Sequence, residues 1–258
     1  MSISDSLWGV RCVWLRYFDV SRKSFWYYLV TTFSEPLLYL LAFGFGVGSL
    51  IGTLQVNGAS VAYRSFVFAG ILGQTVLFQG FYEASYGGFV RMYYQKIYSA
   101  MAVTPITLSE VLWGELLWDS TKSTVAAQVV VLIGIATGDF PTISLLSVLP
   151  IAFFSSLLFA GLGLTVAARA RSIDEISYPQ YLLIFPMFLF CGVFYPIEQL
   201  PAALQWAAWV LPLTSVNSLM RTLTLGFPFQ AWSVPILAGW LVLLIAFGRR
   251  SMYARLVK

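Results

Sequence analysis

Glu35 is a carboxylate inside an otherwise apolar stretch that begins at Trp26, and Pro36 follows it directly. In a helix that starts at Trp26, Glu35 would lie about 14 Å along the axis, well inside the hydrocarbon of a membrane. A charge at that depth is costly against lipid and usually faces a protein interior or a wet cavity. Three roles are open: binding an ion, contacting polar groups of a transported molecule, or holding helices together by hydrogen bonding.

A second set of charges is Glu115, Asp119 and Lys122, spaced by four and three residues. This spacing places all three side chains on one face of a helix. We expect them to satisfy one another near a membrane interface, where lone charges would be expensive.

Motifs of most enzyme classes are absent from the sequence. The chain has no histidine, which removes the commonest metal ligand and proton shuttle. It contains no Gly-Lys dipeptide, and therefore no phosphate-binding loop of the Walker type, and no Gly-x-Ser-x-Gly nucleophile turn. No residue is a candidate for catalysis or for metal binding.

Three functions fit a chain without these motifs. The first is transport powered by a separate ATPase. The second is a proton-coupled secondary transporter or channel with Glu35 as its ion-binding group, but such proteins commonly contain an internal repeat, and none is visible here. The third is an intramembrane enzyme acting on lipid, which would need a paired acid and base within the spans. ATPase-driven transport is favoured.

Composition indicates an integral membrane protein. Of the 258 residues 59% are hydrophobic and only 10% are charged, whereas soluble domains carry about 25% charged residues. The 17% aromatic content suits belts at the membrane interfaces. The net charge of +4 is spread over many segments, so no patch indicates nucleic-acid binding.

The apolar runs predict an all-α membrane protein, one domain over residues 1–258 with six transmembrane helices. Residues 1–25 form an amphipathic surface helix with Leu7, Val10, Trp14 and Phe18 on one face. Residues 52–63 form an external loop around Asn57-Gly58. The six predicted spans are residues 26–49, 65–84, 113–136, 144–168, 179–195 and 232–247.

Residues 201–225 are predicted to form a re-entrant hairpin. Two apolar pieces, 201–211 and 214–225, are separated by Pro212, and each is only about 17 Å long as a helix, too short to cross. Thr214 or Ser215 would cap the second piece. The alternative, one kinked span, would place the final span on the wrong side for its charges.

Lysine and arginine counts predict that both termini are cytoplasmic. In the predicted six-span topology, twelve of these residues lie on the same side of the membrane as the N-terminus. Two, Arg64 and Arg221, lie on the opposite side. This asymmetry is a strong positive-inside signal. The twelve are Arg11, Arg16, Arg22, Lys23, Arg91, Lys96, Arg169, Arg171, Arg249, Arg250, Arg255 and Lys258.

The stretch 87–105 is predicted to form a cytosolic amphipathic helix over residues 90–104. Val90, Tyr94, Ile97 and Met101 recur at helical spacing, while Gly87-Gly88 would loosen the chain before it and Pro105 would end it. Such a helix can lie in the lipid interface, connect two spans, or receive a cytosolic partner.

The order of these elements resembles the ABC-2 type permeases. The segment from Glu35 to Gly48 resembles the first span of that family, Ala100-Met-Ala-Val-Thr-Pro105 resembles the end of its coupling helix, and Leu211-Pro-Leu-Thr214 with Arg221 resembles its late Leu-Pro motif. The segment from Glu83 to Met92 is most similar to the branch that contains nodulation-factor (lipo-chitooligosaccharide) exporters.

This resemblance implies a homodimer in a bacterial inner membrane, bound to two copies of an ATP-binding-cassette subunit. ATP and magnesium would be held by that partner, and this chain would bind no cofactor. The exported molecule would be a lipid-linked or amphiphilic glycan or, alternatively, a drug-like amphiphile. Residues 91–105 would be the coupling helix, with the contacts Arg91, Tyr94, Lys96, Ile97, Tyr98, Met101, Thr104 and Pro105.

Spans one, two and five would line the export pathway in a protein of this kind. Glu35 is then a candidate contact for the exported molecule. Span five could offer aromatic surfaces to an acyl chain or a sugar face, although these rings could equally face lipid. The candidates are Phe185, Phe188, Phe190, Phe194 and Tyr195.

Overall fold

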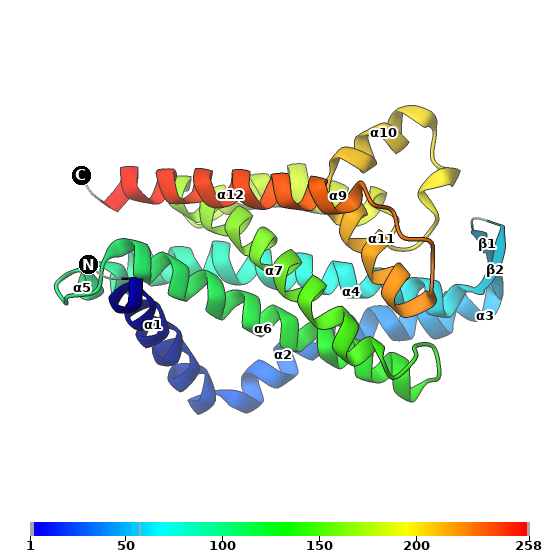
Figure 1. Cartoon of the computed structure of the whole chain (residues 1–258), viewed down its shortest axis with the longest axis horizontal. Coiled ribbons are helices and arrows are strands. Elements are labelled where there is room, and N and C mark those ends of the chain that lie inside the picture. Colours follow the sequence, from blue (N-terminus) through cyan, green and yellow to red (C-terminus); the bar gives the residue numbers. More distant parts are fainter. Residues whose placement is uncertain (1–2, 57, 257–258) are drawn as a thin grey trace.

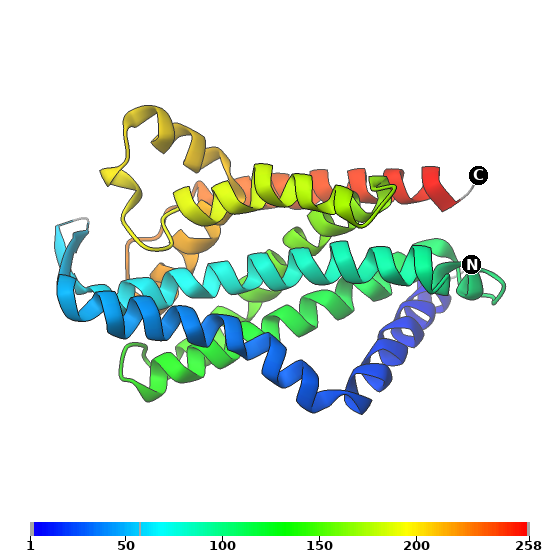
Figure 2. The ribbon, with the colours of Figure 1, turned by 180° about the vertical axis from the view of Figure 1, so that it is seen from behind.

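Long helices run along the longest axis of the molecule in the computed structural model, which describes residues 3–56 and 58–256 (Figure 1). Both ends of the chain lie at one end of this bundle, and a small β-hairpin lies at the other end (Figures 1 and 2). Lys258, one of the twelve cations counted above, and Asn57 lie outside the described residues.

The first long helix begins after α1 (Ile3–Lys23). It consists of α2 (Phe25–Tyr39), the π-helical segment η1 (Leu40–Val47) and α3 (Gly48–Ile51). Pro36 lies within α2, four residues before the π-helix begins. The predicted external loop is instead mostly a hairpin, in which β1 (Thr53–Val56) pairs antiparallel with β2 (Ala59–Ala62).

Residues 63–94 form one continuous helical stretch, so the predicted helix over 90–104 is wrong. The stretch comprises α4 (Tyr63–Tyr82), η2 (Glu83–Gly87) and η3 (Val90–Tyr94), and Gly88 keeps a helical φ of −59°. The fully buried Phe89 packs into the core beside this glycine, and such tertiary packing overrides a low helix propensity. The break comes at Lys96, with a φ of 51°, before the short helix α5 (Ile97–Ala102).

Two helices follow that agree closely with the apolar pattern. Helix α6 (Leu108–Ala136) begins earlier than Trp113 because Thr107 and Glu110 form a capping box at its start. Helix α7 (Ser144–Arg169) ends one residue after the predicted range.

The fifth predicted span is helical only as far as Phe190. The helical stretch begins before the predicted range and comprises η4 (Asp174–Ile176), α8 (Ser177–Pro179), the π-helical η5 (Gln180–Ile184) and α9 (Phe185–Phe190). The chain then turns at Gly192, whose φ of 73° suits glycine. The buried Arg221 donates hydrogen bonds to the carbonyls of Gly192 and Val193, and these bonds satisfy the turn.

Residues 196–225 form short helices, of which α10 projects from the bundle (Figures 1 and 2). They are η6 (Ile197–Gln199), α10 (Ala202–Val210) and α11 (Pro212–Leu225), so the predicted separation near Pro212 is confirmed. The predicted cap is wrong, because Leu211 occupies the N-cap position and Thr214 donates to the carbonyl of Ala208. The last helix, α12 (Ser233–Leu256), extends beyond Phe247.

The amphipathic leader packs on the bundle with a face slightly different from the predicted one. Val13 and Tyr17 are buried among the α1 side chains that the structure describes, and Trp14 is half-buried against α6. Leu7 and Phe18, two members of the predicted apolar face, remain exposed. Helix α1 therefore packs on α6 and still presents apolar side chains to its surroundings.

Four helical stretches of the described residues are long and apolar enough to cross a membrane. The other two predicted spans are not among them: α6 carries charges in its first half, and the helical stretch that contains α9 ends early, at Phe190. The count of six spans stays a prediction. The four stretches are Ser34–Ile51, Tyr63–Tyr94, Ser144–Arg169 and Ser233–Arg255.

Helix α7 packs against α4, α6 and α12, and small residues allow the close approach. A Cβ added at Gly163 would lie 2.5 Å from the carbonyl oxygen of Phe81 in α4, and 3.0 Å from the Cβ of Ala84. The contact is therefore backbone against backbone, and neither helix can yield by rotating a side chain.

We predict that Gly163→Ala destabilises the protein by about 1–3 kcal/mol, because the added methyl group overpacks this contact. Thermal unfolding of the purified protein in detergent measures the effect. Gly239→Ala in α12 is the matched control, since its added methyl group would meet nothing within 4 Å. Equal stability of both variants would show that the helices do not need this close approach.

Candidate functional site

Five charged side chains meet where η2 and η3 pack against α6. The guanidinium of Arg91 lies at the centre: its Nε donates to Oε1 of Glu115 at 2.7 Å, and its Nη1 donates to Oε1 of Glu83 at 2.9 Å. Lys122 pairs with the other carboxylate oxygen of Glu83. Oδ1 of Asp119 lies 3.5 Å from Nη2 of Arg91. We call these five residues the Arg91 cluster.

The predicted face of α6 is confirmed, but its charges are organised by another helix. Glu115 and Asp119 both pair with Arg91 from η3, and Lys122 pairs with Glu83 from η2. Spacing within one helix could not reveal these partners. Arg91, proposed from the sequence as a docking contact, has a side chain only 12% exposed and lies within the cluster.

Burial makes the Arg91 cluster costly to disrupt. The side chains of Glu115 and Asp119 are fully buried, and three carboxylates face two cations. Within the described residues, neither carboxylate oxygen of Asp119 accepts a hydrogen bond. Removing one partner of a buried pair leaves an uncompensated charge in a medium that solvates it poorly. The cluster therefore locks the end of the residue 63–94 helix to α6.

Helix α1 covers the cluster from the side. The ring of Tyr17 lies 5.2 Å from the guanidinium carbon of Arg91, within the range of a cation–π contact. Trp14 donates from Nε1 to Oγ1 of Thr121 and meets Trp118 edge to face. These contacts tie α1, α6 and η3 together.

A cavity of about 980 Å³ lies beside the Arg91 cluster. Its walls come from α1, α2, α4, η2, η3, α5 and α6, and include charged, tyrosine and glutamine side chains. They include Arg16, Tyr17, Gln79, Tyr82, Glu83, Tyr86, Arg91 and Lys122.

Aromatic rings from three helical regions meet in a cluster that adjoins the cavity at Phe78, whose ring lies 5.5 Å from that of Tyr82. Phe43 of η1 and Phe194 have ring centroids 4.2 Å apart, and Tyr39 of α2 and Phe188 of α9 have centroids 5.6 Å apart. Phe78 of α4 contacts Phe188 at 5.2 Å. We call these five residues the aromatic wall.

Glu35 lies near the aromatic wall and is half-buried. It is close enough to Tyr39 and Tyr82 to interact electrostatically with both phenols. Tyr82 also lies in the cavity wall, so Glu35, the wall and the cavity are neighbours.

The span-five aromatics divide between the wall and the surface. Phe188 and Phe194 belong to the wall, and Phe185 contacts Phe78 and stacks on Tyr181. The hydroxyl of Tyr195 donates a hydrogen bond to the carbonyl oxygen of Leu189. Phe190 is 36% exposed.

The predicted docking residues at the tip of the molecule also divide into two groups. Tyr94, Lys96, Thr104 and Pro105 are exposed, whereas Tyr98 and Met101 are buried and Ile97 is half-buried. Sequence reasoning missed two exposed side chains, Tyr93 and Val103, the latter 87% exposed. Val103 lies in the segment Ala100-Met-Ala-Val-Thr-Pro105. An apolar residue directly before a Thr-Pro pair that ends a helix could have indicated an exposed contact residue. We call the exposed set the α5 patch, because its residues flank α5 on both sides; it comprises Tyr93, Tyr94, Lys96, Val103, Thr104 and Pro105.

Comparison with known proteins finds one family and several relatives that match most of the chain. The ABC-2 type transporter family matches residues 10–225. Nodulation protein J of Rhizobium leguminosarum bv. trifolii is 34% identical over 216 residues, covering 84% of this chain and 81% of that protein. Nodulation protein J of Rhizobium meliloti (strain 1021) is 31% identical over 86% of this chain and 83% of its own length. The inner membrane transport permease YadH of Escherichia coli (strain K12) is 23% identical, over 73% of this chain and 72% of its own.

We predict that Arg91→Met destabilises the protein by about 3–5 kcal/mol, because it leaves buried carboxylates without their cation. Thermal unfolding in detergent measures the loss. Arg11→Met removes the same charge from an exposed position of α1 and should change little. A further substitution, Glu115→Met, should recover part of the loss in the Arg91→Met background, since it removes an unpaired charge. No recovery would show that Arg91 acts through packing alone.

Proposed function

The chain belongs to the ABC-2 type transporter family, and on this premise we propose that it is the membrane-spanning permease subunit of an ATP-driven exporter. It is a multi-pass protein of a bacterial inner membrane, in the branch of Nodulation protein J. The family match over residues 10–225 carries the proposal. Because the sequence contains no phosphate-binding loop, ATP would be hydrolysed by a separate subunit. We propose two copies of that subunit on a homodimer of this chain.

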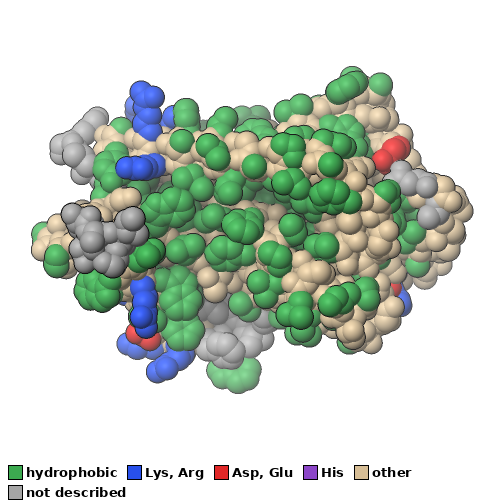
Figure 3. Space-filling model, viewed as in Figure 1, with side chains coloured by type: hydrophobic (Ala, Val, Ile, Leu, Met, Phe, Trp, Pro, Cys, Tyr) green, Lys and Arg blue, Asp and Glu red, His purple; other side chains and the backbone are tan. Residues whose placement is uncertain are grey.

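The charge distribution supports a cytoplasmic position for both termini. Figure 3 shows lysine and arginine side chains gathered in a band near the end of the molecule where the chain ends lie. The α5 patch projects beyond this band (Figures 1 and 3). A positive band of this kind is typical of the cytoplasmic interface.

The α5 patch is the proposed docking surface for the ATPase. Tyrosine side chains such as the exposed Tyr94 are common anchors in a partner's groove, and the exposed Val103 adds apolar area to the patch. Directly behind the patch, the Arg91 cluster joins the patch-bearing helix to α6 and, through Tyr17, to α1. A push on α5 would therefore reach several helices through rigid contacts.

The proposed export pathway runs along Glu35 and the aromatic wall. Aromatic rings offer flat surfaces to sugar faces and acyl chains, and a carboxylate can accept hydrogen bonds from hydroxyl groups. Both ligand types occur together in a lipo-oligosaccharide or another amphiphilic glycan, the substrate class that we propose. The cavity beside the Arg91 cluster includes Tyr82, which lies near Glu35, and this cavity would admit the polar part of such a molecule.

We predict that Tyr94→Asp combined with Val103→Asp prevents assembly with the ATPase. Two anchors of about 1–2 kcal/mol each would be lost, so the affinity should fall at least tenfold. Co-purification of the ATPase and ATP hydrolysis by the complex measure this loss. The permease purified without its partner should hydrolyse no ATP.

Ser172→Asp is the control for this experiment, because it adds a charge at an exposed position outside the patch. Substitution of the buried Tyr98 would confound docking with stability, so the exposed pair is the sharper choice. Normal assembly of the Tyr94→Asp/Val103→Asp protein would exclude the patch as the docking surface.

We predict that Glu35→Gln lowers export by about tenfold to a hundredfold, because a hydrogen bond to a charged acceptor contributes about 1.5–3 kcal/mol. The amide keeps the shape and most of the hydrogen bonding, so expression, dimerisation and basal ATP hydrolysis should stay normal. Export into the medium is the measurement, and Glu198→Gln, at an exposed carboxylate in η6, is the control. Export at the parental rate would assign Glu35 to helix packing.

A further inference from the structure

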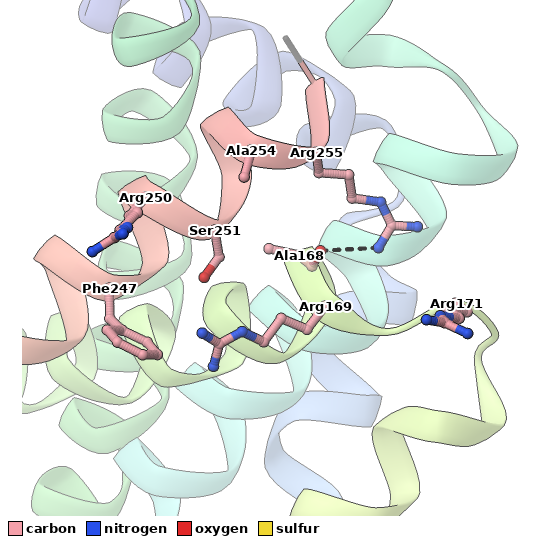
Figure 4. A pocket seen from close by; sticks show the side chains of 8 residues that line it. All are labelled: Ala168, Arg169, Arg171, Phe247, Arg250, Ser251, Ala254 and Arg255. Atoms are coloured by element: carbon pink, nitrogen blue, oxygen red, sulfur yellow. Dashed lines mark hydrogen bonds between the residues drawn. The ribbon is translucent and has the colours of Figure 1, made fainter. Parts of the chain in front are cut away.

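A pocket of about 640 Å³ lies between the C-terminal ends of α7 and α12 (Figure 4). Arginines dominate its lining, together with one hydroxyl and one aromatic ring, and no carboxylate among the described residues lines it. The lining residues are Ala168, Arg169, Arg171, Phe247, Arg250, Ser251, Ala254 and Arg255. None of them belongs to the α5 patch, the Arg91 cluster or the aromatic wall.

One of these arginines has a structural role. Nη1 of Arg255 donates to the carbonyls of Ala167 and Ala168, each at 3.1 Å, and to that of Ala170. These are carbonyls at the end of α7, where the helix has no partners for them and its dipole is negative. Arg255 thus fastens α12 to α7 and closes one side of the pocket, as Figure 4 shows for Ala168.

The other three arginines of the pocket, Arg169, Arg171 and Arg250, form no ion pair within the described residues. The nearby Glu175 accepts a hydrogen bond from the backbone nitrogen of Arg171. All three arginine residues are exposed, so the pocket presents positive charge to its surroundings.

An apolar surface continues from the pocket along α12. The guanidinium of Arg169 lies over the ring of Phe247 at 4.3 Å, and that ring is 44% exposed. Further along α12, Val242 and Leu243 are also exposed. A ligand with a phosphate for the arginines and a hydrocarbon part for this surface would use both features, whereas a free phosphate would use only the first.

We propose that this pocket binds the phosphate of an anionic phospholipid headgroup, with the lipid chains lying along the exposed face of α12. Arginine matches phosphate oxygens with paired donors, and basic pockets at the cytoplasmic interface attract anionic headgroups. The pocket lies at the C-terminal ends of α7 and α12, and none of its lining residues belongs to the proposed docking surface (Figure 4). The bound lipid joins the ends of α7 and α12 from outside.

Native mass spectrometry of the purified full-length protein, titrated with phosphatidylglycerol, tests the proposal. Arg250→Gln should weaken binding about fivefold, the factor expected for one cation at an anionic surface, and Arg169→Gln/Arg250→Gln about 25-fold. Arg249→Gln is the matched control, since Arg249 is adjacent and exposed but lies outside the pocket, near the ring of Tyr253. It should change binding less than twofold.

Two further measurements in the same titration identify whether the bound phosphate belongs to a lipid and whether a lipid or a protein occupies the pocket. Phosphatidylcholine should bind much more weakly, and inorganic phosphate at the same concentration should not displace phosphatidylglycerol. Displacement by inorganic phosphate would overturn the lipid assignment, and so would equal losses in the Arg249 and Arg250 variants. If the double variant keeps its lipid but loses the co-purifying ATPase, the arginines contact protein and the proposal is wrong.

Discussion

The ion pairs of Arg91 hold the tip of the molecule in a fixed position relative to its interior. The guanidinium of Arg91 forms ion pairs with carboxylates on both η2 and α6, at Glu83 and Glu115. Because the pairs are buried, they cannot exchange for water at low cost. The α5 patch follows within a few residues of η3, so its position depends on this cluster. A partner that moves the patch must move α6 with it or break the pairs.

The two proposed ligand surfaces lie on either side of this cluster. On one side the exposed Tyr94 and Val103 face outward, and on the other the cavity leads to Tyr82 and the neighbouring Glu35. Docking and pathway are thus joined by rigid contacts rather than by a flexible linker. This is the arrangement expected when the energy source is a separate subunit and the work is done within the membrane.

Local pattern predicts most of the helices but few of their partners. Helix α7 was predicted within one residue, because a long apolar run is defined by hydropathy alone. Gly87-Gly88 does not break the helix, because Phe89 is buried in the core and Arg91 pairs with carboxylates of α6, outside the segment. The face shared by Glu115, Asp119 and Lys122 was predictable from spacing, whereas their partners on η2 and η3 were not. Contacts between helices are invisible to periodicity.

The aromatic wall constrains how a large molecule could pass. Ring centroids 4.2 Å apart, as in Phe43 and Phe194, leave no room for a sugar between them. A passage therefore requires that these helices separate, or that the wall forms one side of a path between two copies of the chain. Three helical stretches next to the wall contain π-helical segments, η1, η2 and η5. Such segments are rare and concentrate at functional sites. Their position is where helices would have to shift against one another for the wall to open.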